Sequence, residues 1–106
     1  MNRFRLSEHA QGDLNEIWEY IGVEKDNPKA ADRLIEKFFQ QMSLLGSQPR
    51  IGQRRDEWSP DLRVFPAGNY VILYYPDGEL IEVIGVVYGA RDLPALFDRG
   101  RRRPDS

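Results

Sequence analysis

Apolar residues recur with helical spacing early in the chain, after a short alternating stretch. Residues 2–6 alternate in polarity with Phe4 and Leu6 on one side, which predicts a half-buried strand. Ser7 then stands where an N-cap residue is expected. An amphipathic helix follows and ends near residues 23–25. Its apolar positions fall within an arc of about 100°: Ala10, Leu14, Ile17, Trp18 and Ile21.

A second helix is predicted from Asn27, which can cap it, and Pro28, which fits the first helical position. Its broad apolar stripe runs to Gly46, which favours a helix end. The stripe consists of Ala31, Leu34, Ile35, Phe38, Phe39, Met42 and Leu45. The short connection predicts an antiparallel helical hairpin. Leu44 falls on the polar side and is a weak indication of a partner surface.

The second half alternates between turn residues and apolar runs. Two prolines and a glycine predict a loop over residues 47–61. Strands are predicted at 62–66, 70–75 and 80–88, with the sequence PDGE forming the last turn. The middle strand is apolar on both faces, which is typical of a central strand covered on two sides. Gly85 predicts a bulge or the close approach of another element.

The order β-α-α-β-β-β predicts the α+β class. We expect a helical hairpin packed on one face of a mostly antiparallel four-stranded sheet. Residues 93–98 form one more helical turn in this prediction. A single domain then covers residues 1–98, and 99–106 are an arginine-rich tail without fixed structure.

Composition narrows the functional classes. The net charge of −2 argues against a protein that coats nucleic acid. All lysines lie before residue 48, and arginines supply the cations after it, which favours bidentate contacts to carboxylate or phosphate unless it reflects genome composition. The chain has no cysteine and therefore no disulfide or thiolate site. No apolar run approaches the roughly 20 residues of a membrane span, and no signal peptide is evident, so we expect a cytoplasmic protein.

Few residues are suited to catalysis. The single histidine, His9, falls in the first turn of the first helix, where a solvated surface position is expected. No glycine-rich phosphate loop, serine elbow or metal-spaced cluster is visible, and the residues predict no metal site and no cofactor. An enzyme of this sequence would depend on arginine, tyrosine and carboxylates alone.

A set of motifs in residues 49–93 is more specific. They read PRIGQRRDEWSPDLRVFPAGNYVILYYPDGELIEVIGVVYGARDL, with a Pro-x-x-Gly loop, a Leu-Arg-x-Phe-Pro-x-Gly strand, a Tyr-Val-Ile-x-Tyr strand and a closing Gly-Ala-Arg-Asp. This combination closely resembles the ParE branch of the RelE/ParE toxin superfamily. The stretch RLSEHAQGDLNEIWEYI resembles its first strand and helix. The resemblance extends over about residues 3–97 and implies the toxin of a bacterial type II toxin–antitoxin system.

The resemblance implies two mechanisms between which the residues help to choose. ParE-like members block DNA gyrase without known catalytic residues, and RelE-like members cleave mRNA in the ribosome. Where RelE-like nucleases usually carry a basic residue and a tyrosine, this chain has Val71 and Phe97, and only Arg63 represents their lysine-rich second strand. We therefore expect a gyrase inhibitor without catalytic residues. The alternatives are a RelE-type ribosome-dependent mRNA endonuclease, and a degenerate member that only binds an antitoxin and regulates its operon.

Five residues are candidates for target or partner binding: Arg63, Tyr74, Tyr88, Arg91 and Asp92. Arg63 could instead be a structural partner of Asp61, Glu82 or Asp92. Tyr88 stands where the ParE-like pattern usually has histidine. Arg91 is expected to act in recognition or as a brace, and Asp92 to cap the final helical turn.

A partner is also expected, because one hairpin covers only one face of a sheet. A helix laid in a groove, or a strand added at an edge, would cover the rest. The resemblance implies a cognate ParD-like antitoxin, with a disordered segment that folds on binding, and DNA gyrase as target. Membrane association, and sequence-specific nucleic-acid binding by the chain alone, are not expected. The residues expected to line the antitoxin groove are Leu44, Val71, Leu73 and Tyr75.

Overall fold

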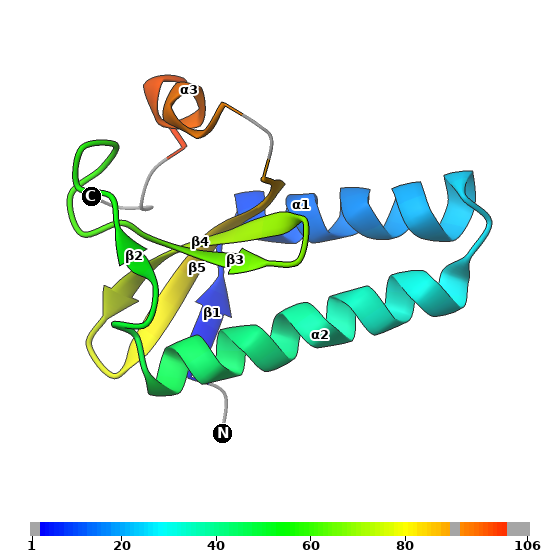
Figure 1. The fold of residues 1–106 in the computed structure, drawn as a ribbon, viewed down its shortest axis with the longest axis horizontal. Coiled ribbons are helices and arrows are strands. Elements are labelled where there is room, and N and C mark those ends of the chain that lie inside the picture. Colours follow the sequence, from blue (N-terminus) through cyan, green and yellow to red (C-terminus); the bar gives the residue numbers. More distant parts are fainter. Residues whose placement is uncertain (1–2, 90–91, 102–106) are drawn as a thin grey trace.

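The computed structural model describes residues 3–89 and 92–101, in which helices lie on both faces of one sheet (Figure 1). The first half forms a strand and a long helical hairpin, and the second half forms the remaining strands and a short helix. In chain order the elements are β1 (Phe4–Leu6), α1 (Glu8–Glu19), the π-helix η1 (Tyr20–Glu24), α2 (Pro28–Ser47), β2 (Gln53–Arg54), β3 (Arg63–Ala67), β4 (Tyr70–Asp77), β5 (Leu80–Tyr88) and α3 (Leu93–Asp98).

The sheet has the strand order β1-β5-β4-β3-β2, with β1 parallel to β5 and the other pairs antiparallel. The α+β class and the mostly antiparallel sheet are confirmed. The predicted number of four strands is wrong by one, because β2 forms within the expected loop and pairs with Arg63 and Val64 of β3. A two-residue strand is too short to show an alternating pattern, so the sequence contained no signal for it.

The helix starts follow their predicted caps. The Ser7 hydroxyl accepts a hydrogen bond from the Ala10 N–H at 3.1 Å, and the Asn27 side chain accepts one from the Ala30 N–H at 3.2 Å. Gly46, however, does not end the second helix, which continues to Ser47. A Cβ at Gly46 would lie 2.6 Å from the Arg3 carbonyl oxygen, so this glycine allows α2 to approach the N-terminal strand.

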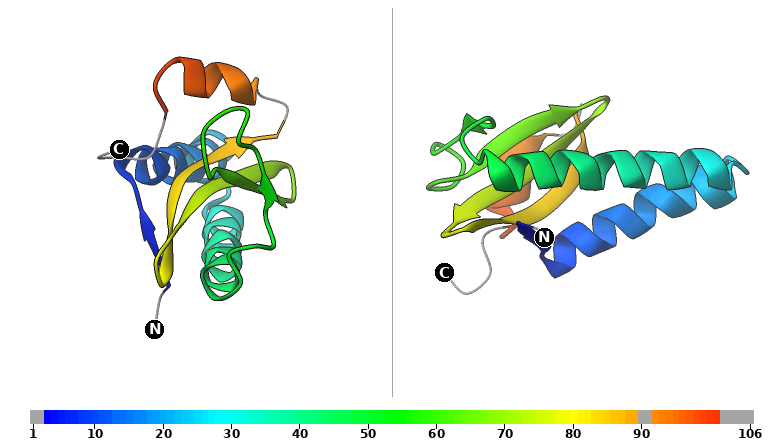
Figure 2. Two further views of the ribbon diagram at one scale, coloured as in Figure 1. Left: turned by 90° about the vertical axis from the view of Figure 1, so that its left-hand side faces the viewer. Right: turned by 90° about the horizontal axis from the view of Figure 1, so that it is seen from below.

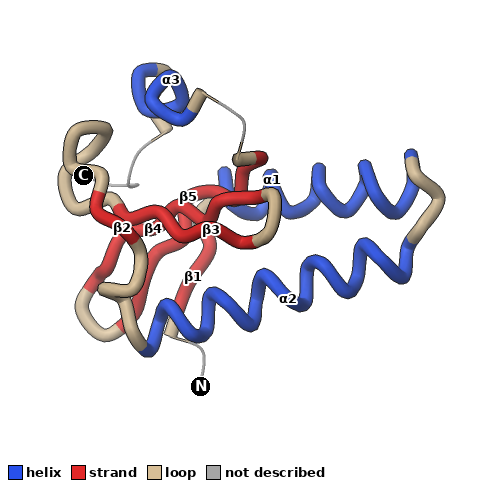
Figure 3. Tube along the Cα trace, viewed as in Figure 1, coloured by secondary structure: helices blue, strands red, loops and turns tan. Residues whose placement is uncertain are grey.

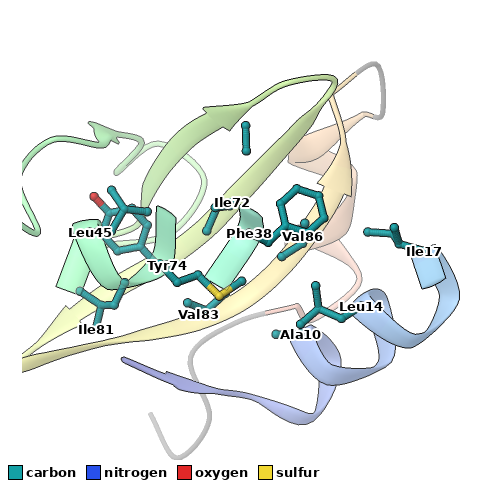
Figure 4. Close-up of a cluster of buried hydrophobic side chains, with 12 residues drawn as sticks. Ala10, Leu14, Ile17, Phe38, Leu45, Ile72, Tyr74, Ile81, Val83 and Val86 are labelled. Carbon is teal, nitrogen blue, oxygen red and sulfur yellow. The ribbon is translucent and has the colours of Figure 1, made fainter. Parts of the chain in front are cut away.

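The main core lies between the hairpin and the sheet (Figure 4). Of the side chains predicted to face inward, Ala10, Leu14 and Ile17 of α1 are buried here, whereas Trp18 is only half-buried and lies outside this core. Helix α2 adds its apolar stripe. Buried members of this core are Ala10, Leu14, Ile17, Phe38, Met42, Leu45, Ala67, Ile72, Tyr74, Ile81, Val83 and Val86. The closed end of the hairpin, with η1, extends beyond the sheet (Figure 1).

A second core covers the other face of the sheet, where the sequence predicted open surface. The short helix α3 and the loop before β3 pack on this face (Figures 2 and 3). Its buried members are Leu62, Val64, Leu73, Tyr75, Ile84, Val87, Leu96 and Phe97. One helical turn is enough because Phe97 and Leu96 both point into the sheet and Trp58 stacks on Phe97, with ring centroids 6.4 Å apart.

Gly85 has both roles that the sequence allowed. The register of β4 and β5 changes from Leu73 opposite Gly85 to Tyr74 opposite Val83, so Ile84 is the extra residue of a β-bulge. An added Cβ at Gly85 would also lie 2.7 Å from Arg101 Nη1. The glycine therefore leaves room for a side chain that arrives from beyond α3.

Candidate functional site

Arg63 and Tyr74, two predicted contact residues, fasten the loop after α2 to the sheet. Arg63 Nη1 donates to the carbonyl oxygens of Gly52 at 2.7 Å and Arg50 at 3.2 Å. The Tyr74 hydroxyl donates to the Pro49 carbonyl at 2.7 Å and accepts from the Gly52 N–H at 2.9 Å. Burial raises the pKa of Tyr74. These contacts occupy both side chains within the fold.

The carboxylates suggested as partners of Arg63 are engaged elsewhere. Asp61 lies 3.3 Å from Arg54, and Glu82 accepts from Arg5 Nε at 3.2 Å. The Asp92 side chain accepts from the Ala95 N–H at 3.4 Å and caps α3, as predicted. Arg63 is thus braced by backbone oxygens and not by an acid.

Arginines do gather beside this brace. A hollow of about 320 Å³ is lined by Arg50, Arg54 and Arg63, and by Asp61 on the same side. Arg54 also lies 3.0 Å from Asp56. The Asp61 N–H, and then Arg54, lower the pKa of Asp56. The carboxylates offset the positive charge of the arginines, and Arg63 is held by carbonyl oxygens. The hollow is therefore poorly suited to bind phosphate, and its arginines mainly hold the loop in place.

The four predicted groove residues do not form one surface. Leu73 and Tyr75 are fully buried under α3 and the loop before β3, and Val71 is half-buried at the margin of that core. The Tyr75 hydroxyl also lies 2.5 Å from Ser59 Oγ. Leu44 is exposed, but it belongs to α2 across the sheet. The chain covers this face with its own α3. The prediction of an antitoxin groove here did not consider that cover.

Tyr88 is a predicted contact residue whose ring is accessible in the described structure. It lies at the end of β5, 53% exposed, with its ring edge-to-face against Tyr70 at a centroid distance of 5.7 Å. Tyr70 packs edge-to-face on Phe38 at 5.4 Å. Burial raises the pKa of Tyr70, and the neighbouring hydroxyls of Tyr88 and Tyr20 raise it further. Arg91, the last candidate, lies outside the described residues.

An ion pair that the sequence did not predict joins the two ends of the chain. Asp13 Oδ2 accepts from Arg101 Nη1 at 2.7 Å and from the Val86 N–H at 3.0 Å. Arg101 Nη1 also donates to the Ile84 carbonyl at 3.1 Å. Arg101 was assigned to a tail beginning at residue 99, yet the folded part reaches it. Its neighbours in an arginine-rich segment gave no sign that this one arginine is structural.

A groove also runs between the two long helices. It measures about 370 Å³ and is lined mainly by apolar side chains from β1, α1 and α2: Leu6, Leu14, Trp18, Ile35 and Phe39, with Gln11 and Asn15 at its border. The Trp18 indole N–H donates to Asp32 at 2.8 Å across the hairpin. The broad apolar stripe of α2 was the sequence signal for this groove, because one face of a sheet cannot cover the whole stripe.

No helix in the described part of the chain is long and apolar enough to span a bilayer. Those residues also contain no group of three or more histidine, cysteine or acidic side chains arranged to hold a metal ion.

Comparison with known families decides the broader assignment. The model of the ParE toxin of type II toxin–antitoxin systems, parDE, matches residues 4–93. The chain belongs to the ParE toxin family. It is therefore a toxin-family member of the type II toxin–antitoxin class, as the motifs in residues 49–93 indicated.

Individual ParE relatives agree with this assignment. Toxin ParE1 of Mycobacterium tuberculosis is 29% identical over 93 residues, covering 87% of this chain and 94% of the relative. Toxin ParE3 of Caulobacter vibrioides is 25% identical over 99 residues, covering 93% and 98%. A solved structure titled as a chromosomal ParDE system from P. aeruginosa aligns with a TM-score of 0.66 at 18% identity. It covers 83% of this chain and 96% of the other, and supports the ParE fold.

Proposed function

We propose that this ParE-family chain inhibits DNA gyrase by binding it, without catalysing a reaction, and that a cognate antitoxin neutralises it. Family membership carries the toxin part of the proposal. The gyrase target follows from the ParE branch of the superfamily and from the residues that occupy the positions used by its nuclease branch.

The observation that carries the choice of target is that the Arg63 side chain is already bound within the fold. Its guanidinium is held by two backbone carbonyls, at 2.7 and 3.2 Å, and stabilises a loop. Val71 offers no polar group, and the Phe97 ring is buried against Trp58. Positions that would supply charge stabilisation and a hydroxyl in an mRNA endonuclease thus serve packing here, which favours action by binding.

The groove between α1 and α2 is the site that we assign to the antitoxin. The face originally expected to receive it is closed by α3, whereas the hairpin groove remains open and is mainly apolar. An antitoxin helix with an apolar face suits such a groove. The solved structure that this chain resembles is that of a chromosomal ParDE system, which supports a partner of this kind.

Expression in a bacterial host tests the toxin–antitoxin relationship. Induction of the chain alone should arrest growth, and co-expression of the small neighbouring gene product should restore it and co-purify with the chain. A robust soluble monomer without any effect on growth would contradict the proposal.

Two matched variants test the groove. Asn15→Arg places a long charged side chain at the border of the groove, and Glu19→Arg changes a solvent-exposed position of α1 that does not line it. The first should weaken antitoxin capture and restore toxicity, and the second should leave both unchanged. Equal capture of the two variants would place the antitoxin elsewhere.

A further inference from the structure

Three tyrosines from distant parts of the chain surround a small hollow beside the end of β5. Tyr20 comes from the start of η1, Tyr70 from the start of β4, and Tyr88 from the end of β5. Glu16 and Asp13 of α1 complete its polar border. The hollow measures about 210 Å³, below the roughly 300–1,000 Å³ typical of small-molecule sites. Its size suits one side chain of a partner.

Packing within the fold holds one of the three rings on two sides and leaves the other two more exposed. Tyr70 is held edge-to-face between Phe38 and Tyr88. Tyr20 and Tyr88, by contrast, are 48% and 53% exposed. Aromatic side chains that present a ring to solvent beside a hollow are typical of contact surfaces, because the ring supplies apolar area and the hydroxyl a polar group.

Tyr20 reaches this border by the regular spacing of an α-helix. Asp13, Glu16, Ile17 and Tyr20 all line the hollow, the last three at positions three, four and seven residues after the first. The Tyr20 N–H donates to the Glu16 carbonyl and its backbone is right-handed helical, so it continues α1 before the π-helix Tyr20–Glu24 widens the turn. One face of the helix therefore carries both the carboxylates and the ring.

The charge at the hollow is negative on balance. Asp13 is neutralised by Arg101, at 2.7 Å. Glu16 is exposed and makes no ion pair with any residue that the structure describes. Lys25 Nζ lies 5.3 Å from the centroid of the Tyr20 ring, yet Lys25 does not line the hollow. The tyrosine ring already has a cationic neighbour, and the carboxylate at the border is available for another.

We propose that this hollow receives an arginine side chain of a partner protein. A guanidinium can lie against the faces of Tyr20 and Tyr88, donate to their hydroxyls, and pair with the Glu16 carboxylate. Arginine fits better than lysine, because its planar group can stack on a ring while its N–H groups reach a carboxylate. The proposal requires a basic partner segment only and does not depend on gyrase being the target.

An NMR titration with the peptide Ac-Gly-Arg-Gly-NH2 tests the site on the whole chain. Its neutral isostere, with citrulline in place of arginine, is the matched control. The arginine peptide should cause saturable shifts of the ring protons of Tyr20, Tyr70 and Tyr88, and the citrulline peptide should bind at least about tenfold more weakly, since it lacks the charge that attracts ring and carboxylate.

Variants separate the ring from the charge. Tyr88→Ala and Glu16→Gln should each weaken arginine-peptide binding by about tenfold, whereas Val23→Ala, at an exposed apolar position outside the hollow, should not. Both altered positions are exposed, so the backbone spectrum should otherwise be retained. Shifts away from the three tyrosines, equal binding of arginine and citrulline peptides, or unchanged binding by Tyr88→Ala would each overturn the proposal.

Discussion

Asp13 and Arg101, 88 positions apart, form a two-point ion pair beside the bulge of β5, with contacts of 2.7 and 3.3 Å. Strand β1 pairs only with Ile81–Val83, so β5 continues beyond it without a strand on that side. The ion pair takes over there, because Asp13 accepts from the Val86 N–H and Arg101 donates to the Ile84 carbonyl. Two side chains thereby satisfy backbone groups that no strand reaches.

Arg101→Ala should destabilise the fold. Both side chains of the pair are nearly buried, with 12% and 13% exposure, so removal of one leaves the other with an uncompensated charge. We expect a loss of about 3 kcal/mol in the free energy of unfolding, measured by urea denaturation. Arg99→Ala, at an exposed position two residues earlier, should change it by less than about 0.5 kcal/mol. Equal urea midpoints for the two variants would show that Arg101 does not stabilise the fold and belongs to a solvated tail.

Gly85→Ala should disturb the same ion pair from the opposite side. The new methyl group would lie 2.7 Å from Arg101 Nη1 and 3.2 Å from Asp13 Oδ2, so the pair must shift. We expect a loss of about 1–3 kcal/mol. Gly12→Ala is the matched control, since a Cβ there meets nothing within 4 Å and helix propensity favours alanine. The double variant Gly85→Ala/Arg101→Ala should lose less stability than the sum of the losses of the two single variants.

Tyr74→Phe tests the brace of the loop after α2. The substitution keeps the buried ring but leaves the Gly52 N–H and the Pro49 carbonyl without their hydroxyl partner. We expect a loss of about 1–3 kcal/mol in the free energy of unfolding. Tyr88→Phe, on an exposed ring, should have little effect on stability. A Tyr74→Phe protein as stable as the parent would show that the loop does not depend on this hydroxyl.

Alkaline pH should weaken the fold through the same residue. Burial raises the pKa of Tyr74 in the folded state above its usual value of 10.0, so folding favours the protonated hydroxyl. This contribution to stability is complete below about pH 10 and is lost as pH rises through the folded-state pKa. Unfolding followed between pH 9 and 11 should show a steeper loss for the parent than for Tyr74→Phe. Parallel pH profiles would contradict this assignment.

Arg91→Ala addresses the one predicted contact residue outside the described part of the chain. In the sequence this arginine stands three positions after the last residue of β5, and recognition and bracing are its two predicted roles. Under the binding mechanism, Arg91→Ala should abolish gyrase inhibition while circular dichroism and antitoxin capture remain unchanged. Loss of the folded spectrum would identify Arg91 as a brace instead.

The sequence predicted elements whose signals are local. Ser7 and Asn27 marked the helix starts, and the apolar stripes predicted the hairpin. Gly85 predicted the bulge. Each of these signals depends on residues close to one another in the sequence. The α+β class followed from the order of these elements. The same local reasoning failed at β2, where two residues are too few for a pattern, and at Gly46, where a close approach to Arg3 explains the glycine better than a helix end.

The candidate site depended on contacts between distant residues and was predicted less completely. Arg63 and Tyr74 were predicted as contact residues, and the structure shows them holding a loop whose backbone oxygens follow no pattern in the sequence. Leu73 and Tyr75 were expected at the surface because the six residues of α3 gave little sign that they cover a whole sheet face. Tyr20 lies near Tyr88 because α1 packs beside β5, and no local pattern in the sequence indicated that contact.

Supercoiling of relaxed plasmid by purified DNA gyrase, with increasing amounts of the purified chain, tests whether the chain inhibits gyrase. We expect inhibition that increases with the amount of toxin and is relieved by an equimolar antitoxin, while translation by purified ribosomes leaves mRNA intact. Full gyrase activity together with mRNA cut at defined codons would contradict the account and establish a ribosome-dependent endonuclease.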